Sequence, residues 1–198
     1  MNELVVLLGV VIALMAVTTL IFTPARWLLR RVELVMLTGS VLVILFVMGF
    51  VCAEVMMRYI FNSPIPGHLE GSELLMPIIV FLAISYTQRV RGHVGMDLLI
   101  EALSPNARRV ATCVTLLVSS FVCAILAYFS YKSAYQLWEY DDVTMTPPYF
   151  KTWPAGASIA IGYALLSARM FLQVLSEIDP DRFPDDIDES ERELHQTE

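Results

Sequence analysis

The stretch that decides the fold is residues 34–53, LVMLTGSVLVILFVMGFVCA, which contains no charged residue. A helix needs about 20 mostly apolar residues to cross the hydrocarbon core of a bilayer. In lipid, a helix is the structure that satisfies all of its backbone hydrogen bonds within one segment. The stretch therefore predicts a transmembrane helix, and with it an integral membrane protein.

The composition of the whole chain agrees with this prediction. The 198 residues are 57% hydrophobic and 17% charged, whereas soluble domains have about 45–50% apolar and about 25% charged residues. The formal net charge is −7, and ten of the 20 acidic residues fall in the C-terminal tail, residues 177–198. Residues 1–176 show no basic patch of the kind that binds nucleic acid, so we expect no nucleic-acid partner.

Four further apolar runs bring the expected number of spans to about five, and predict an all-α integral membrane protein. The first run could instead be a signal peptide, which carries positive charge ahead of its apolar core. Here Glu3 precedes that run and Arg26, Arg30 and Arg31 follow it, which favours a retained span. The four runs are residues 4–22, 74–88, 110–131 and 152–168.

The basic residues predict the orientation of the spans. Alternate junctions carry ten and three Lys or Arg residues, and the junctions richer in positive charge face the cytoplasm. The N-terminus is then periplasmic and the acidic tail cytoplasmic. Trp27, Trp138 and Trp153 fall near predicted span ends, as expected for side chains at the membrane interface.

The first outer loop is RYIFNSPIPGHLEGSE, residues 58–73. Residues 62–67 have the composition of a turn, because two prolines cannot extend the preceding helix. Glu54 and Arg58 are four residues apart and can pair on one helix, while Glu70 and Glu73 fall in the first turn of the next one. These charges either stabilise helix ends or contact a second protein.

Two other loops carry patterns of interest. MDLLIEALSP in the inner loop predicts a short amphipathic helix near residues 96–104, lying along the membrane surface. The second outer loop, WEYDDVTMTPPYFKTWP, groups Glu139, Asp141 and Asp142 ahead of a proline-rich turn. That loop is either a solvated acidic segment or a docking surface.

The histidines and the span centres argue against cofactor chemistry. His68 lies at the outer edge, His93 at the inner edge and His195 in the tail, so no two of them can ligate one haem across the bilayer. The span centres also lack the ionisable groups typical of an ion pathway. We therefore expect no cofactor, no metal site and no catalytic residue, and interpret the chain as a scaffold that works with another protein.

Three segments in order resemble the DctQ-like small membrane subunit of tripartite ATP-independent periplasmic (TRAP) transporters, over about residues 33–176. They are RYIFNSPIPGHLEGSELL, RVRGHVGMDLLIEALSP and TPPYFKTWPAGASIAIGYALLSAR. The family pattern has R-Y-x-F-N-x-P, acidic residues opening the next helix, G-H-x-x-x-D-L-L, P-x-G and a closing arginine. The matching positions are Arg58, Tyr59, Phe61, Asn62, Pro64, Glu70, Glu73, Gly92, His93, Asp97, Leu98, Leu99, Pro154, Gly156 and Arg169.

The resemblance implies a non-enzymatic scaffold subunit of a sodium-coupled transporter in the bacterial inner membrane. Its partners would be a large membrane subunit, which holds the substrate and sodium sites, and a periplasmic substrate-binding protein. The cargo would be an organic acid such as a carboxylate. The alternatives are a stand-alone membrane anchor or assembly protein, and a redox membrane subunit.

Two features depart from the family pattern. The family subunit has four spans, whereas this chain adds an N-terminal one. Glu70 and Glu73 are three residues apart, whereas acidic residues in the family are often adjacent. We expect an extra helix and basic loop in residues 1–31, a four-span domain in 32–176 and a disordered acidic tail in 177–198. The candidate interface or structural residues are Arg58, Tyr59, Asn62, Glu70, Glu73, Arg89, His93, Asp97, Asp141, Asp142 and Arg169.

Overall fold

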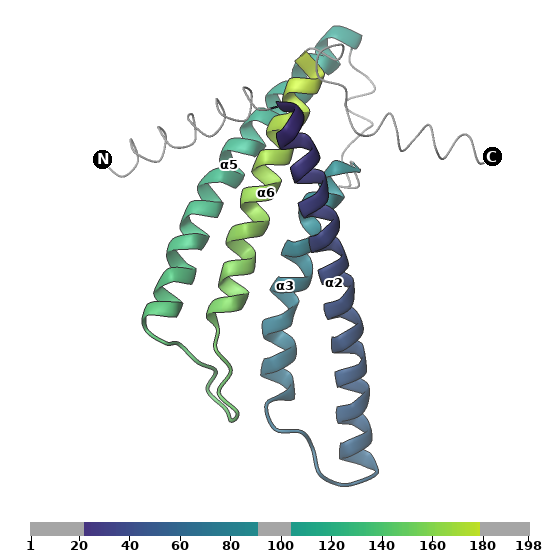
Figure 1. Ribbon diagram of the computed structural model, residues 1–198, viewed down its shortest axis with the longest axis vertical. Coiled ribbons are helices and arrows are strands. Elements are labelled where there is room, and N and C mark those ends of the chain that lie inside the picture. The colour runs from purple at the N-terminus through teal and green to yellow at the C-terminus, as the bar shows by residue number, and fades with distance from the viewer. Residues whose placement is uncertain (1–21, 91–103, 179–198) are drawn as a thin grey trace, which may run out of the picture. The chain divides into compact units, whose positions relative to one another are not determined.

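The computed structural model describes residues 22–90 and 104–178, and four long helices account for most of them (Figure 1). Each helix is long and apolar enough to cross a membrane. The all-α membrane fold and the second to fifth predicted spans are therefore confirmed. The helices are α2 (Phe22–Tyr59), α3 (His68–Arg89), α5 (Pro105–Glu139) and α6 (Trp153–Ile178).

Several predictions fall on other parts of the chain. The span expected at residues 4–22, the amphipathic helix near 96–104 and the acidic tail from residue 179 lie outside the described residues. His93 and Asp97 lie outside them as well. Four spans are thus found among the described residues, and the N-terminal one, expected at residues 4–22, stays a prediction.

The helices extend beyond the apolar runs that predicted them. α2 begins at Phe22, so Arg26, Arg30 and Arg31 lie in its first turns rather than in a loop. Arginine is a good helix former, so a helix continues through it where lipid gives way to water. α5 begins at Pro105, a first-turn position where the missing proline N–H has no helical partner to lose.

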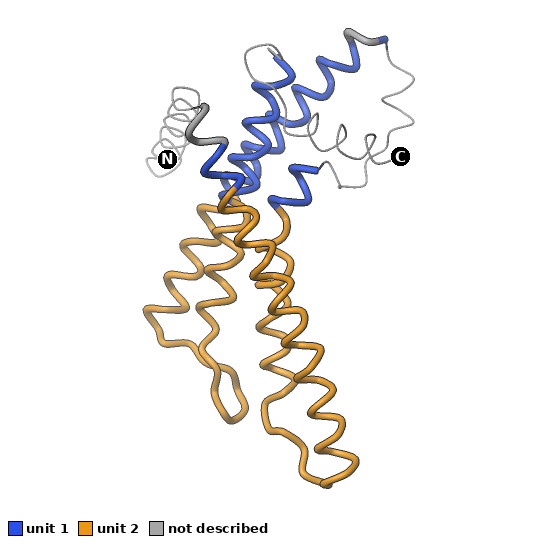
Figure 2. The backbone as a smooth tube through the Cα atoms, turned by 45° about the vertical axis from the view of Figure 1, so that its right-hand side comes forward, with its two compact units in different colours: residues 1–30, 85–125, 164–198 blue, residues 31–84, 126–163 orange. Residues whose placement is uncertain are grey.

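The chain divides into two compact units, and each of the four helices contributes to both (Figure 2). Unit 1 comprises residues 1–30, 85–125 and 164–198, and unit 2 comprises residues 31–84 and 126–163.

In unit 2, α3 contacts both α2 and α6. The Ser40 hydroxyl of α2 donates to the carbonyl of Ile79 at 2.8 Å. On the other side of α3, the rings of Phe81 and Tyr163 pack edge to face with centroids 4.9 Å apart. A Cβ added at Gly162 would lie 2.5 Å from the Phe81 carbonyl oxygen, so only glycine permits this approach of α6 to α3.

Polar side chains join the helices of unit 1. The Gln88 amide donates to Oε1 of Gln173 at 2.7 Å, and the Gln173 amide donates back to the Gln88 carbonyl at 3.0 Å. Ser120 and Ser167 each donate a hydroxyl to the other's carbonyl at 2.9 Å. Reciprocal bonds of this kind hold helices together in lipid, where burial of apolar surface drives association less than it does in water.

The helices differ in how far the chain itself covers them. Within the most apolar window of each helix, 44% of the α6 residues are buried, against 11% in α5 and 6% in each of α2 and α3. Many apolar side chains of α2 and α5 are therefore exposed, whereas most of those of α3 are half-buried. In a membrane protein such faces meet lipid or another membrane helix.

Candidate functional site

Two loops of unit 2 meet at one end of its helices (Figure 2). We call them the paired loops: residues 60–67 between α2 and α3, and residues 140–152 between α5 and α6. The backbone N–H of Thr146 donates to Oε2 of Glu70, at the start of α3, over 3.3 Å. A Cβ added at Gly67 would lie 2.5 Å from Cδ of Pro148. The two loops therefore form one continuous surface.

The first paired loop owes its path to its turn residues. Asn62 and Gly67 have positive φ angles of 49° and 74°, a region that Asn and Gly enter more readily than other residues. The N–H of Ser63 donates to the carbonyl of Met57 at 3.1 Å and closes the end of α2. The turn predicted for residues 62–67 is confirmed.

A buried carboxylate anchors the helices beside this loop. The Glu54 side chain is 4% exposed, and Nε of Arg58 donates to its Oε1 at 2.9 Å. Nε2 of His68, the first residue of α3, lies 3.7 Å from the same oxygen and 3.4 Å from the Arg58 guanidinium. A buried carboxylate is stable when such donors surround it. The predicted pair of Glu54 and Arg58 is thus confirmed, and His68 joins it.

The second paired loop is a small hairpin. Val143 and Lys151 form an isolated antiparallel bridge, and Nζ of Lys151 lies 2.7 Å from Oδ1 of Asp141. The Thr152 hydroxyl donates to Oδ2 of Asp142 at 3.0 Å, directly before α6 begins. An exposed ion pair contributes only about 0–1 kcal/mol, so the backbone bridge and the threonine bond do most to fix the hairpin.

The rim of the paired loops is apolar as well as acidic. The Met145 side chain is 95% exposed, Tyr59 80%, Tyr140 78% and Ile60 70%. Aromatic residues and methionine are enriched in surfaces that other proteins cover. Within residues 22–90 and 104–178, no three His, Cys, Asp or Glu side chains gather closely enough to hold a metal ion.

Comparison with models of known protein families identifies the family of this chain. The family model described as "Tripartite ATP-independent periplasmic transporters, DctQ component" matches residues 47–179. The chain belongs to the DctQ family. The match runs from the second half of α2 to the end of α6 and includes both paired loops. No curated protein sequence matches the chain.

Membership of the DctQ family indicates which component of a transporter this chain is. It is the small subunit of a tripartite ATP-independent periplasmic transporter, and its four apolar helices make it a multi-pass membrane protein. The resemblance read from the sequence is confirmed, although the match begins at residue 47 rather than near residue 33.

The structure separates the predicted site residues of this DctQ subunit into three groups. Arg89 and Arg169 lie in unit 1, while His93 and Asp97 lie outside the described residues. The remaining ones gather in unit 2, on the paired loops or the adjoining helix ends. They are Arg58, Tyr59, Asn62, Glu70, Glu73, Asp141 and Asp142.

Glu70 and Glu73 have different surroundings although both lie in the first turns of α3. Glu70 accepts a hydrogen bond from Thr146 across the paired loops. The Glu73 side chain is exposed, and its carboxylate forms no hydrogen bond with the described part of the chain. The two carboxylates therefore provide a matched pair, one joining the loops and one beside them.

The two unit 1 arginines are buried. Arg89 is 8% exposed and Arg169 3% exposed. The Arg89 guanidinium lies over the ring of Tyr86, 5.1 Å from its centre, an attractive arrangement for a desolvated cation. Neither arginine is therefore part of an exposed surface of unit 1.

Sequence reasoning missed the residues that join the paired loops. Gly67 lies against Pro148, and Thr146 supplies the hydrogen bond to Glu70. Glycine directly before a helix start and a double proline were available signals for turns. Neither signal says that two turns far apart in the chain meet.

Proposed function

We propose that this DctQ subunit is the scaffold of a sodium-coupled transporter that imports an organic acid such as a carboxylate. It works in the bacterial inner membrane, bound to a large membrane subunit that carries the substrate and sodium. The paired loops face the periplasm, where they dock a substrate-binding protein.

The polar groups of the described spans support a scaffold role. Ser120 pairs with Ser167, Gln88 pairs with Gln173, and Ser40 donates to a backbone carbonyl. Intramembrane polar groups that serve transport face a pathway or cavity. The polar groups named here form hydrogen bonds between helices of this chain. Such bonds hold the helices together, as a scaffold for another subunit requires.

The charge distribution supports a periplasmic position for the paired loops. The first turns of α2 carry Arg26, Arg30 and Arg31, and those of α5 carry Arg108 and Arg109. Positive residues collect on the cytoplasmic side. The opposite helix ends, where the paired loops lie, are then periplasmic, as is the N-terminus if residues 4–22 form a fifth span.

The observation that carries the docking proposal is the contact between the paired loops. The two paired loops form one surface because Thr146 donates a hydrogen bond to Glu70 and Gly67 lies against Pro148. A surface held in place by its own contacts loses little conformational freedom when a partner binds. Its carboxylates and exposed apolar side chains suit a protein partner.

Reconstitution tests the scaffold role. The large subunit, this chain and the binding protein would be placed in proteoliposomes with a sodium gradient and a radiolabelled carboxylate. We expect omission of this chain to lower uptake at least about tenfold, equivalent to ~1.4 kcal/mol. Equal uptake without it would contradict the scaffold role. A chain that purifies alone from cells expressing the whole transporter would indicate a stand-alone anchor.

Charge reversal at the paired loops tests docking. We expect Glu70→Lys to raise the binding-protein concentration needed for half-maximal uptake about tenfold, since a mismatched interfacial charge costs more than ~1 kcal/mol. Asp141→Lys should act in the same direction. Glu73→Lys is the matched control and should change this concentration less than about twofold. If all three variants behave like the unmodified chain, these charges serve contacts within the chain and its helix ends, and the docking proposal is wrong.

A further inference from the structure

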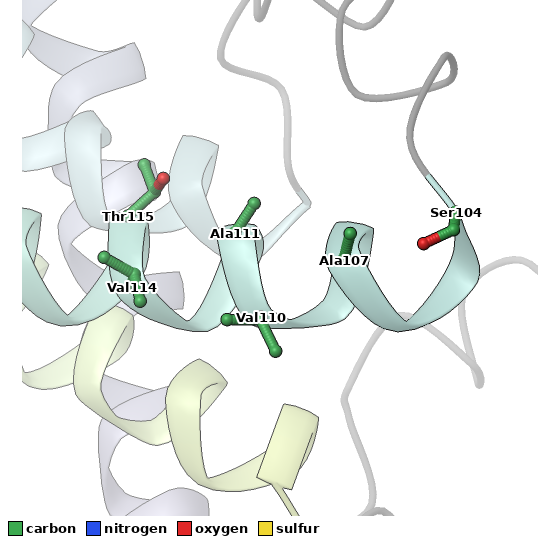
Figure 3. A pocket seen from close by; sticks show the side chains of 6 residues that line it. All are labelled: Ser104, Ala107, Val110, Ala111, Val114 and Thr115. Atoms are coloured by element: carbon green, nitrogen blue, oxygen red, sulfur yellow. The ribbon is translucent and has the colours of Figure 1, made fainter.

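The first turns of α5 carry two exposed arginines, Arg108 and Arg109. They follow Ala107, which Figure 3 shows at the start of this helix. Nε of Arg109 donates to the main-chain carbonyl of Glu177, in the last turn of α6, at 2.9 Å. The start of α5 and the end of α6 therefore lie side by side. From this point the chain continues into residues 179–198, which lie outside the described part.

The described part of unit 1 has a large excess of positive charge. Its residues include six arginines and a single carboxylate side chain, that of Glu177. Such an excess attracts negatively charged groups over about one screening length, ~10 Å at 0.1 M salt. The six are Arg26, Arg30, Arg89, Arg108, Arg109 and Arg169.

One of these positive charges is buried and lacks a negative partner among the described residues. Arg89 is 8% exposed, and its Nη1 atom is buried with no hydrogen-bond acceptor in residues 22–90 and 104–178. The ring of Tyr86 gives the guanidinium an attractive contact but no negative charge. A cation removed from water is costly unless an anion lies near it. Unit 1 would therefore be stabilised by a negatively charged group bound to it.

The segment that follows α6 has the opposite charge. Residues 179–198 contain nine acidic and two basic residues, a net charge of −7. Asp179 comes only two positions after Glu177, whose carbonyl Arg109 binds. Because the segment is tethered there, its effective concentration at the arginines is on the order of 1 mM. A lipid headgroup or a small anion also carries negative charge, but neither is held at this place by the chain.

We propose that residues 179–198 fold back on unit 1 and bind its arginines through their carboxylates, with Arg108 and Arg109 as the contact surface. A guanidinium binds a carboxylate well because it donates two parallel N–H groups. The Arg108 guanidinium forms no hydrogen bond with the described residues. Arg109 uses Nε for Glu177, which leaves its terminal N–H groups for a carboxylate. This contact does not depend on the proposed transport role.

Photocrosslinking of the full chain, one copy per phosphatidylcholine nanodisc, tests this contact. Ile187→benzoylphenylalanine places a photoreactive group among four carboxylates of the tail. At about 0.1 M salt we expect the main adducts in residues 104–112. Raising the salt to about 1 M should lower their yield at least about fivefold, because the screening length falls from about 10 Å to about 3 Å.

Charge variants separate binding from tethering. Arg108→Glu should lower the adduct yield at least about fivefold and leaves the Arg109 bond to Glu177 in place. Asp185→Lys with Asp186→Lys should lower it as well, and adding these two changes to Arg108→Glu should raise the yield again at least about threefold. Lys132→Glu is the control, since it makes the same change of charge at an exposed side chain nearer the other end of α5. It should leave the yield unchanged.

Three results would overturn the proposal. Adducts that persist at high salt and in Arg108→Glu would come from tethering alone. An equal loss in Lys132→Glu would mean that the contact is not at the start of α5. Adducts mainly with lipid, or a loss of the protein adducts when phosphatidylglycerol is added to the nanodiscs, would assign the arginines to lipid headgroups. The tail variant carries the test should Arg108→Glu fail to fold.

Discussion

Glycines in two helices of unit 2 have opposite surroundings. In α6, a Cβ added at Gly162 would meet the Phe81 carbonyl at 2.5 Å, and one at Gly156 would meet Ala134 at 3.3 Å. In α2, no side chain or foreign backbone of the described residues lies within 4 Å of a Cβ added at Gly39 or Gly49. Small residues let membrane helices approach closely. Those of α6 are used within the chain, whereas those of α2 leave open surface on a helix that little else covers.

The largest effect should come from filling the α6 contact. Gly162→Leu places side-chain atoms where α3 already lies, so we expect a loss of about 3 kcal/mol or more in the free energy of unfolding. Thermal unfolding in detergent, followed by tryptophan fluorescence, measures it. Gly39→Leu is the control and should cause no loss. If the two variants unfold alike, the contrast between α6 and α2 is wrong.

A smaller effect should separate two glycines of the loop end. Gly67→Ala combines a positive φ angle with a Cβ 2.5 Å from Pro148, and we expect it to cost about 1–3 kcal/mol. Gly71 lies in α3, where an added Cβ would be in ordinary contact, 3.4 Å from Phe150. Gly71→Ala should therefore be neutral or stabilising. Limited proteolysis of the paired loops would report the difference, and equal cleavage rates would contradict it.

The smallest effects should come from α2. Gly39→Ala and Gly49→Ala each replace a poor helix former where no neighbour is crowded, so we expect a gain of about 0.5–1 kcal/mol at each site. The same unfolding measurement on the purified chain checks this. A loss of stability at either position would mean that this face of α2 is packed within the chain.

Apolar run length predicted the four described helices but not their ends. The run at residues 110–131 became a helix from Pro105 to Glu139. Hydropathy measures which residues lipid accepts, whereas a helix continues until its backbone is interrupted. Past Glu139 the chain turns at Asp141, whose φ is 49°. Likewise Arg169 does not end α6, because it is buried within unit 1.

Local spacing predicted one part of the candidate site and could not predict the rest. Glu54 and Arg58 are one helical turn apart, so their pairing follows from helix geometry alone. The contacts of Gly67 with Pro148 and of Glu70 with Thr146 join segments far apart in the sequence. The spacing of residues along the sequence cannot predict these contacts, because they depend on how the two paired loops pack against each other. The family resemblance supplied the function that these patterns could not.

The pairing of Glu54 with Arg58 also bears on how the protein is made. Chains are synthesised from the N-terminus, and both residues belong to α2, so the acid gains its cation as soon as that helix forms. A lone carboxylate would hinder entry of α2 into the bilayer. We expect the pair to lower the cost of placing α2 in the bilayer before α3 has been made. His68 comes to lie 3.7 Å from the Glu54 carboxylate only after the turn and α3 have followed.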